Sequence, residues 1–266
     1  MLEIRLLGAV DVIIDRRSVD IGHARQASVL AALLIDVNRW VSIDRLVERV
    51  WGECPPARSN SALYSYVSRL RRVLSTTEDF RIIRKSGGYI AASDPLGIDM
   101  HLFRSLLDRA RKADDHGQAL SLLDQALELW RGEAFATLSS QWLETVRESL
   151  DRERFAAELD RNDLVLRCGG HAAILADLVA QAAAYPLDER LAGQLILALH
   201  RCGRTADALS VYRRTAQQLA DELGVDPGPR LQQLELAILR NDTAHIGGHR
   251  HHAVWQAEPV SPAVTS

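Results

Sequence analysis

The sequence contains little cysteine and no long apolar run. Cys54, Cys168 and Cys202 are odd in number and form no CxxC pair, so neither a disulfide framework nor a zinc site is predicted. The longest apolar run, Val29–Ile35, is far shorter than the roughly 20 residues that cross a bilayer. The N-terminus also lacks the basic start and long apolar region of a signal peptide. We therefore expect reduced thiols, no membrane partner and a cytoplasmic location.

Motifs of common catalytic sites are also absent. The patterns GxxxxGK[ST], GxSxG and HExxH do not occur, and the segment RKSGGY (84–89) lacks the lysine placement and following helix of a phosphate-binding loop. Histidines near the C-terminus are candidate metal ligands: His245, His249, His251 and His252. Nothing in this polar segment predicts a rigid helix to orient them. The sequence thus predicts no metal, no cofactor and no enzymatic activity.

Length and composition are those of a folded protein with two domains. The chain has 266 residues, of which 47% are hydrophobic and 25% are charged, as in soluble globular proteins. The net charge is -3, which by itself argues against nucleic-acid binding. Residues 1–97, however, hold 14 basic and 11 acidic residues, a balance of +3. The basic excess lies between Arg58 and Lys85, and a localised basic patch of this kind attracts phosphate.

The first 97 residues show the element order of a winged helix-turn-helix domain. Alternating apolar residues predict strands at LEIRLL, AVDVII and SVDI. Apolar residues at helical spacing then predict a helix from Arg25 onward and, after the predicted cap Ser42, a second helix over IDRLVERVW. A third helix is predicted over Asn60–Leu74. Two β-rich runs then flank Ser86-Gly87-Gly88, which predicts a hairpin. A linker is expected at DPLG (94–97), where both periodicities stop.

The remainder is predicted to be helical up to residue 240. It is rich in Ala, Leu, Arg and Glu, and HGQALSLLDQALEL resembles CGRTADALSVYRRTAQQL later in the chain. Ala173 and Ala208 lie 35 positions apart, close to the roughly 34-residue period of tetratricopeptide repeats. We therefore expect an α+β winged helix-turn-helix domain (1–97) and an all-α tetratricopeptide-like domain (98–240). Residues 241–266 lose periodicity, which predicts a disordered tail.

The predicted third helix carries the strongest candidate site. One side holds Leu63, Val67, Leu70 and Leu74 and is expected to be buried. The other side could be an ordinary solvated face, but no acidic residue occurs from Ser59 to Thr77, and solvated faces usually mix charge signs. Small residues let a helix enter the major groove, where arginine can bind guanine. The candidate DNA-binding residues here are Ser61, Tyr64, Ser65, Ser68, Arg69, Arg71 and Arg72.

Three further residues are candidates near this helix. Arg84 and Lys85 at the hairpin tip are either plain surface charges or contacts to a phosphate or the minor groove. Trp51 closes the second helix and is either a core aromatic or, through its indole N–H, a phosphate donor.

In sequence the chain resembles the SARP-type (antibiotic regulatory protein) family of transcriptional activators, which control antibiotic and other secondary-metabolite gene clusters. The resemblance spans residues 1–240 and rests on several segments in colinear order. In the first domain they are RLLGAVDV, RQASVLAALL, VSIDRLVERVWGECPP, LYSYVSRLRRVL and SGGY. In the second they are DMHLFRSLL, ALSLLDQALELWRGEAF, YPLDERLAGQLILALHRCGRTADALSVYRR and ELGVDPGPRLQQLELAIL.

The resemblance implies a winged helix of the response-regulator type followed by a bacterial transcriptional activation domain. It places the recognition pattern on Tyr64, Ser65, Ser68, Arg69 and Arg72. The partners that it implies are double-stranded DNA with direct repeats, RNA polymerase holoenzyme and further copies of the chain on DNA, in the nucleoid region of the cytoplasm. The alternatives are a tetratricopeptide-type adaptor with a basic docking surface, or an enzyme whose site was not detected.

Overall fold

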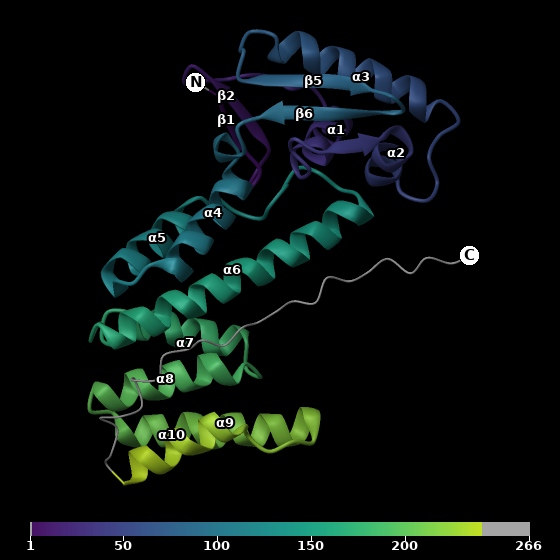
Figure 1. Ribbon diagram of the computed structural model, residues 1–266. Coiled ribbons are helices and arrows are strands. Elements are labelled where there is room, and N and C mark those ends of the chain that lie inside the picture. Colours follow the sequence, from purple (N-terminus) through teal and green to yellow (C-terminus); the bar gives the residue numbers. More distant parts are fainter. Residues whose placement is uncertain (1, 241–266) are drawn as a thin grey trace. The chain divides into compact units, whose positions relative to one another are not determined.

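The computed structural model describes residues 2–240 and divides the chain into two compact units, Met1–Cys168 and Gly169–Ser266 (Figure 1). The predicted tail at 241–266 and its four histidines lie outside the described residues. Of the described helices, none is long and apolar enough to cross a membrane. All three cysteines are free thiols.

The first unit opens with a three-stranded antiparallel sheet of β1 (Leu2–Arg5), β2 (Asp11–Ile14) and β3 (Arg17–Ser18). The first two strands were predicted. The third is shorter than the predicted SVDI and begins one residue earlier. Asp15 and Arg16 both have positive φ, at 49° and 65°, and form a two-residue turn that pairs Ile14 directly with Arg17.

Three helices and a hairpin complete the predicted winged helix-turn-helix arrangement. The helices are α1 (Ala24–Leu34), α2 (Ile43–Trp51) and α3 (Ser59–Leu74), and the hairpin is β5 (Phe80–Lys85) with β6 (Gly88–Ser93). Ser42 caps α2, as predicted, because its hydroxyl accepts the N–H of Arg45 at 3.1 Å. A short strand that was not predicted, β4 (Trp40–Ser42), pairs with β6 and makes a three-stranded sheet in the order β4-β6-β5.

The hairpin is followed by helices that belong to the same compact unit and pack on the same core. A short 3-10 turn, η1 (Pro95–Gly97), leads into α4 (Asp99–Lys112), α5 (His116–Glu128) and α6 (Gln141–Arg167). One hydrophobic core runs from Leu2 to Ala157 and joins strand residues such as Ile4 to Phe103 and Phe135, which are fully buried. The compact unit therefore extends well past the linker expected at 94–97.

Polar contacts also connect the first strand to the helices behind it. The buried carboxylate of Asp99 accepts the backbone N–H groups of Leu6 at 2.7 Å and Leu7 at 3.1 Å, and also bonds the guanidinium of Arg131. Burial raises the pKa of Asp99, although these bonds and the Arg131 charge act to lower it. The N–H of Phe135 donates to the carbonyl of Leu6 at 2.9 Å. Consequently the chain after β1 finds its hydrogen-bond partners in the helical part.

The side chains of Arg49 and His101 also link the winged helix-turn-helix elements to the helices that follow them. Arg49 of α2 donates to the Ala32 carbonyl at 3.0 Å, and its guanidinium lies 4.3 Å from the ring centroid of Trp142 on α6. His101 of α4 lies with Nε2 2.8 Å from the Leu34 carbonyl. Burial lowers the pKa of His101, so the neutral ring is favoured, and Nε2 then donates to that carbonyl.

The second unit consists of helices packed against their neighbours in sequence. They are α7 (Leu175–Ala184), α8 (Glu189–Arg201), α9 (Thr205–Leu223) and α10 (Pro229–Leu239). α8 contacts α7, α9 and α10. The two segments that resemble each other in sequence contain α5 and α9, as expected for tetratricopeptide-like helical hairpins. Asp188 caps α8 by accepting the N–H of Leu191 at 2.8 Å.

Candidate nucleic-acid interface

Helix α3 buries one side and exposes the other. Leu63, Val67, Leu70 and Leu74 are at most 2% exposed, and the helix packs on α1, α2 and β5. The opposite side is formed by side chains at helical spacing, and all of these residues are exposed: Ser61, Tyr64, Ser65, Ser68, Arg69 and Arg72. The structure therefore brings these predicted residues together on one accessible helix face.

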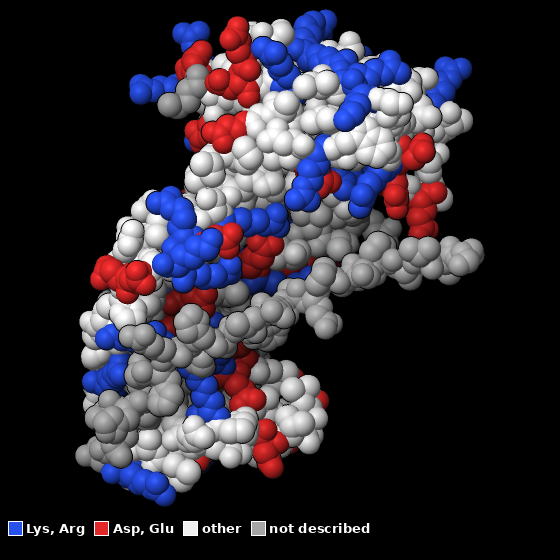
Figure 2. All heavy atoms as spheres, viewed as in Figure 1, with Lys and Arg blue, Asp and Glu red and all other residues white. Residues whose placement is uncertain are grey.

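This outer face is shallow near its start and basic near its end. The hydroxyl of Ser65 donates to the carbonyl of Ser61 at 3.0 Å, so it lies close to the helix axis and leaves room for a groove wall. No ion pair holds Arg69, Arg72 or Lys85 within residues 2–240. Figure 2 shows Lys and Arg side chains gathered over this part of the first unit. Their charge is thus available to an external anion.

The hairpin beside α3 has the shape that a wing requires. Ser86 and Gly87 form its tip, and Gly87 has a φ of 70°, which favours glycine. A Cβ at Gly88 would lie 2.2 Å from the Val41 carbonyl oxygen, so only glycine lets β4 approach β6 here. The carbonyl of Gly87 accepts the N–H of Ile43 at 2.9 Å. The tip is therefore fixed to the start of α2 and presents Arg84 and Lys85, both exposed.

Trp51 occupies a different place from the other candidates. It is half-buried and packs against the core, and its ring stacks on Tyr66 with centroids 6.3 Å apart. Tyr66 in turn meets the ring of His23 edge-on at 5.0 Å. These contacts support the core-aromatic interpretation of Trp51.

Arg71 also differs from the arginines of the outer face. Its Nε donates to the carbonyl of Ile82 on β5 at 2.8 Å, and its guanidinium lies 5.6 Å from the ring centroid of Tyr89. Tyr89 was not among the predicted site residues, and no sequence signal indicates a contact between residues 71 and 89. Among the described residues, no group of three or more His, Cys, Asp or Glu side chains is placed to hold a metal ion.

Comparisons with known proteins agree with this architecture. Residues 98–239 match the model of the bacterial transcriptional activator domain, and residues 21–90 match that of the C-terminal domain of transcriptional regulatory proteins. A solved structure of Mycobacterium tuberculosis EmbR in complex with a low-affinity phosphopeptide is similar, with a TM-score of 0.87 and 32% identity. The match covers 92% of this chain and 67% of that one.

Curated relatives are regulatory proteins. The chain is 31% identical to the regulatory protein DnrI of Streptomyces peucetius, over 91% of this chain and 93% of that protein. It is 38% identical to the regulatory protein AfsR of Streptomyces griseus over 83% of this chain, but spans only 23% of AfsR. These relatives are regulators of transcription rather than enzymes. The chain belongs to the SARP family of transcriptional activators.

Proposed function

We propose that the chain binds specific duplex DNA through α3 and the hairpin, and recruits RNA polymerase to the promoters of a secondary-metabolite gene cluster. The observation that carries this proposal is the exposed serine and arginine face of α3, whose Arg69 and Arg72 have no ion-pair partner among the described residues. Such a face suits the major groove, where arginine forms two hydrogen bonds with guanine. The protein then acts at the nucleoid in the cytoplasm.

The two parts of the site have different tasks in this proposal. Arg69 and Arg72 project from the helix and read bases, since their planar guanidinium groups match guanine. Lys85 at the hairpin tip is a point charge and suits a phosphate. In the proposed division of labour, residues 1–97 contact DNA, whereas residues 98–240 contact RNA polymerase and neighbouring copies of the chain.

Arg69→Ala and Lys85→Ala are expected to have distinct effects. Arg69→Ala should weaken operator binding by about 1 to 3 kcal/mol while random DNA is bound nearly as before, because only a base contact is lost. Lys85→Ala should weaken the binding of operator and of random DNA alike, and it should reduce the slope of log K against log salt by about one. Fluorescence anisotropy over a salt series measures both quantities.

The control for these variants is the thermal melt of each protein, because lost folding would imitate lost binding. Equal loss on operator and random DNA for Arg69→Ala would make Arg69 a phosphate contact. Binding that does not weaken with salt would instead favour the adaptor function, because neutralising several phosphates makes DNA affinity strongly salt-dependent.

Cooperative binding to direct repeats is a second expected result. Two copies bound head to tail on one face of the duplex need half-sites about one helical turn apart. Inserting half a turn, about 5 base pairs, between the repeats should abolish cooperativity while each single site is still bound. Mobility-shift titrations of the original, half-turn and full-turn spacings measure this directly. Equal cooperativity at all three spacings would contradict contact between neighbouring copies.

A further inference from the structure

We propose that Arg71 is a positioning residue that fixes the recognition helix to the wing and does not contact DNA. The proposal rests on the DNA-binding function inferred above. It assigns Arg71, together with Tyr89, a role in holding the angle between α3 and the hairpin.

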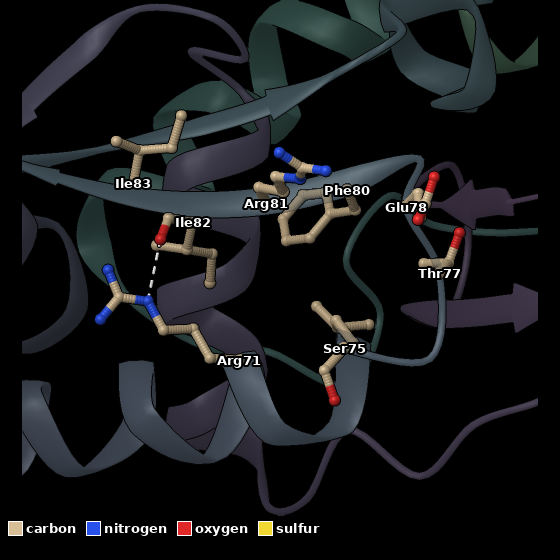
Figure 3. Close-up of a pocket in the computed structure, with 9 residues that line it drawn as sticks. Arg71, Ser75, Thr77, Glu78, Phe80, Arg81, Ile82 and Ile83 are labelled. Atoms are coloured by element: carbon tan, nitrogen blue, oxygen red, sulfur yellow. Dashed lines mark hydrogen bonds between the residues drawn. The ribbon is translucent and has the colours of Figure 1, made fainter.

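The carbonyl that Arg71 binds has no other strand to pair with. β5 is at the edge of the sheet, because the strand order is β4-β6-β5. Ile82 lies in the middle of β5, and its carbonyl accepts the Arg71 Nε–H at 2.8 Å (Figure 3). An edge strand exposes carbonyl groups that need partners. Arg71 therefore attaches the helix to the free edge of the wing.

Two arginine–tyrosine contacts join α3 to the hairpin of β5 and β6. The Arg71 guanidinium of α3 lies 5.6 Å from the ring centroid of Tyr89 on β6, and that of Arg84 on β5 lies 5.6 Å from the ring centroid of Tyr64 on α3. Tyr64 and Arg71 are seven positions apart, hence on one side of the helix. Arg84 and Tyr89 are direct cross-strand partners. Each element thus supplies one arginine and one tyrosine to a reciprocal pair of contacts.

A surface pocket lies beside this connection. A pocket of about 420 Å³ opens between the C-terminal end of α3 and β5, lined by Arg71, Leu74, Phe80 and Ile82 among others (Figure 3). Leu74, Phe80 and Ile82 are buried there, and the polar and cation–π contacts of Arg71 add to this apolar packing between α3 and β5. Loss of Arg71 would consequently let the hairpin move relative to the helix that reads bases.

The test compares Arg71→Met with Tyr89→Leu in the full-length chain. Tyr89 is 3% exposed, so it is not available to DNA. We expect each variant to lose about tenfold in operator affinity, equivalent to about 1.4 kcal/mol, with random-DNA affinity and salt slope unchanged. The double variant should be no worse than Arg71→Met alone, because Arg71→Met already removes the Tyr89 contact together with the hydrogen bond to Ile82. Arg71→Lys should not rescue binding, whereas Tyr89→Phe, which keeps the ring, should bind normally.

Matched controls separate this role from a phosphate contact. Arg81 lies one position before Ile82 on β5 and is exposed, so Arg81→Met should leave the ratio of operator to random-DNA affinity unchanged. A salt slope reduced by about one in Arg71→Met, with rescue by Arg71→Lys and normal binding by Tyr89→Leu, would make Arg71 a phosphate contact and overturn the proposal.

Hydrogen exchange in the free protein tests the connection without DNA. Amide protons of β5 and β6 should exchange faster in Arg71→Met than in the wild type, while those of α8 stay unchanged. Unchanged exchange throughout the hairpin would refute the positioning role. If the wild-type chain binds no DNA, the proposed function fails, and the exchange experiment still decides whether Arg71 holds the wing to α3. Arg71 is at the surface, so its replacement should leave the core intact even if Tyr89→Leu lowers stability.

Discussion

A fragment of residues 1–97 is expected to lose cooperative folding, whereas residues 1–168 should unfold in a single transition. The cut at 97 removes Ile98, Phe103 and Phe135, all fully buried in the same core as Ile4. Each large apolar side chain contributes about 1.5 to 3 kcal/mol on burial, and small domains are stable by only about 5 to 15 kcal/mol. The loss of these three side chains, together with their neighbours, is comparable to the whole stability.

Unsatisfied backbone groups add to that loss. The N–H groups of Leu6 and Leu7 lose the Asp99 carboxylate, and the Leu6 carbonyl loses the N–H of Phe135. Circular dichroism melts of the two fragments measure the difference, and residues 1–168 serve as the matched control. A well-folded 1–97 fragment that binds the operator would show that the winged helix is autonomous. Such a result would contradict the structural argument and support the sequence-based division at residue 97.

Replacing Asp99 should have the largest effect of any single substitution considered. Asp99→Ala leaves the two backbone N–H groups and the Arg131 guanidinium without their acceptor. An unsatisfied buried donor costs about 1 to 3 kcal/mol, and a broken buried ion pair about 3 to 5 kcal/mol. We therefore expect a loss of about 3 to 5 kcal/mol in the free energy of unfolding, measured in urea.

The matched control is another aspartate that accepts a backbone N–H in solvent. Asp115 caps α5 by accepting the N–H of Gln118 at 2.7 Å and is exposed. Asp115→Ala should cost about 1 kcal/mol, the usual value for a helix cap. Similar losses for both variants would mean that burial of Asp99 adds nothing, and that the winged helix is not held to the helices by this group.

Local elements were predictable because their signals lie in neighbouring residues. The stripe of Leu63, Val67 and Leu70 specifies both that α3 forms and which side is buried. Ser42 before an apolar run marks the start of α2. The same helical spacing identifies the outer face that carries Arg69 and Arg72, because a helix that buries one side exposes the opposite side.

Contacts between distant residues left no such signal. β4 has only three residues and no distinct pattern, and it exists because Trp40, Val41 and Ser42 find partners on β6. From the sequence alone, the arginines of α3 cannot be assigned different roles. Only its position against β5 separates Arg71, which is bound to the wing, from Arg69 and Arg72, which have no ion-pair partner among the described residues.

The sequence alone therefore determined the order of the first two strands, the three helices and the hairpin, and which side of α3 is buried and which is exposed, since these depend on periodicity and turn chemistry. Tertiary structure decided where the compact unit ends. Pro95 and Gly97 are residues typical of a linker. However, Ile98 forms a β-bridge with Ile4, and the Asp99 carboxylate accepts the backbone N–H groups of Leu6 and Leu7. Whether a break in periodicity is a free linker or a packed turn depends on what lies across from it, and only folding brings residues more than 90 positions apart into contact.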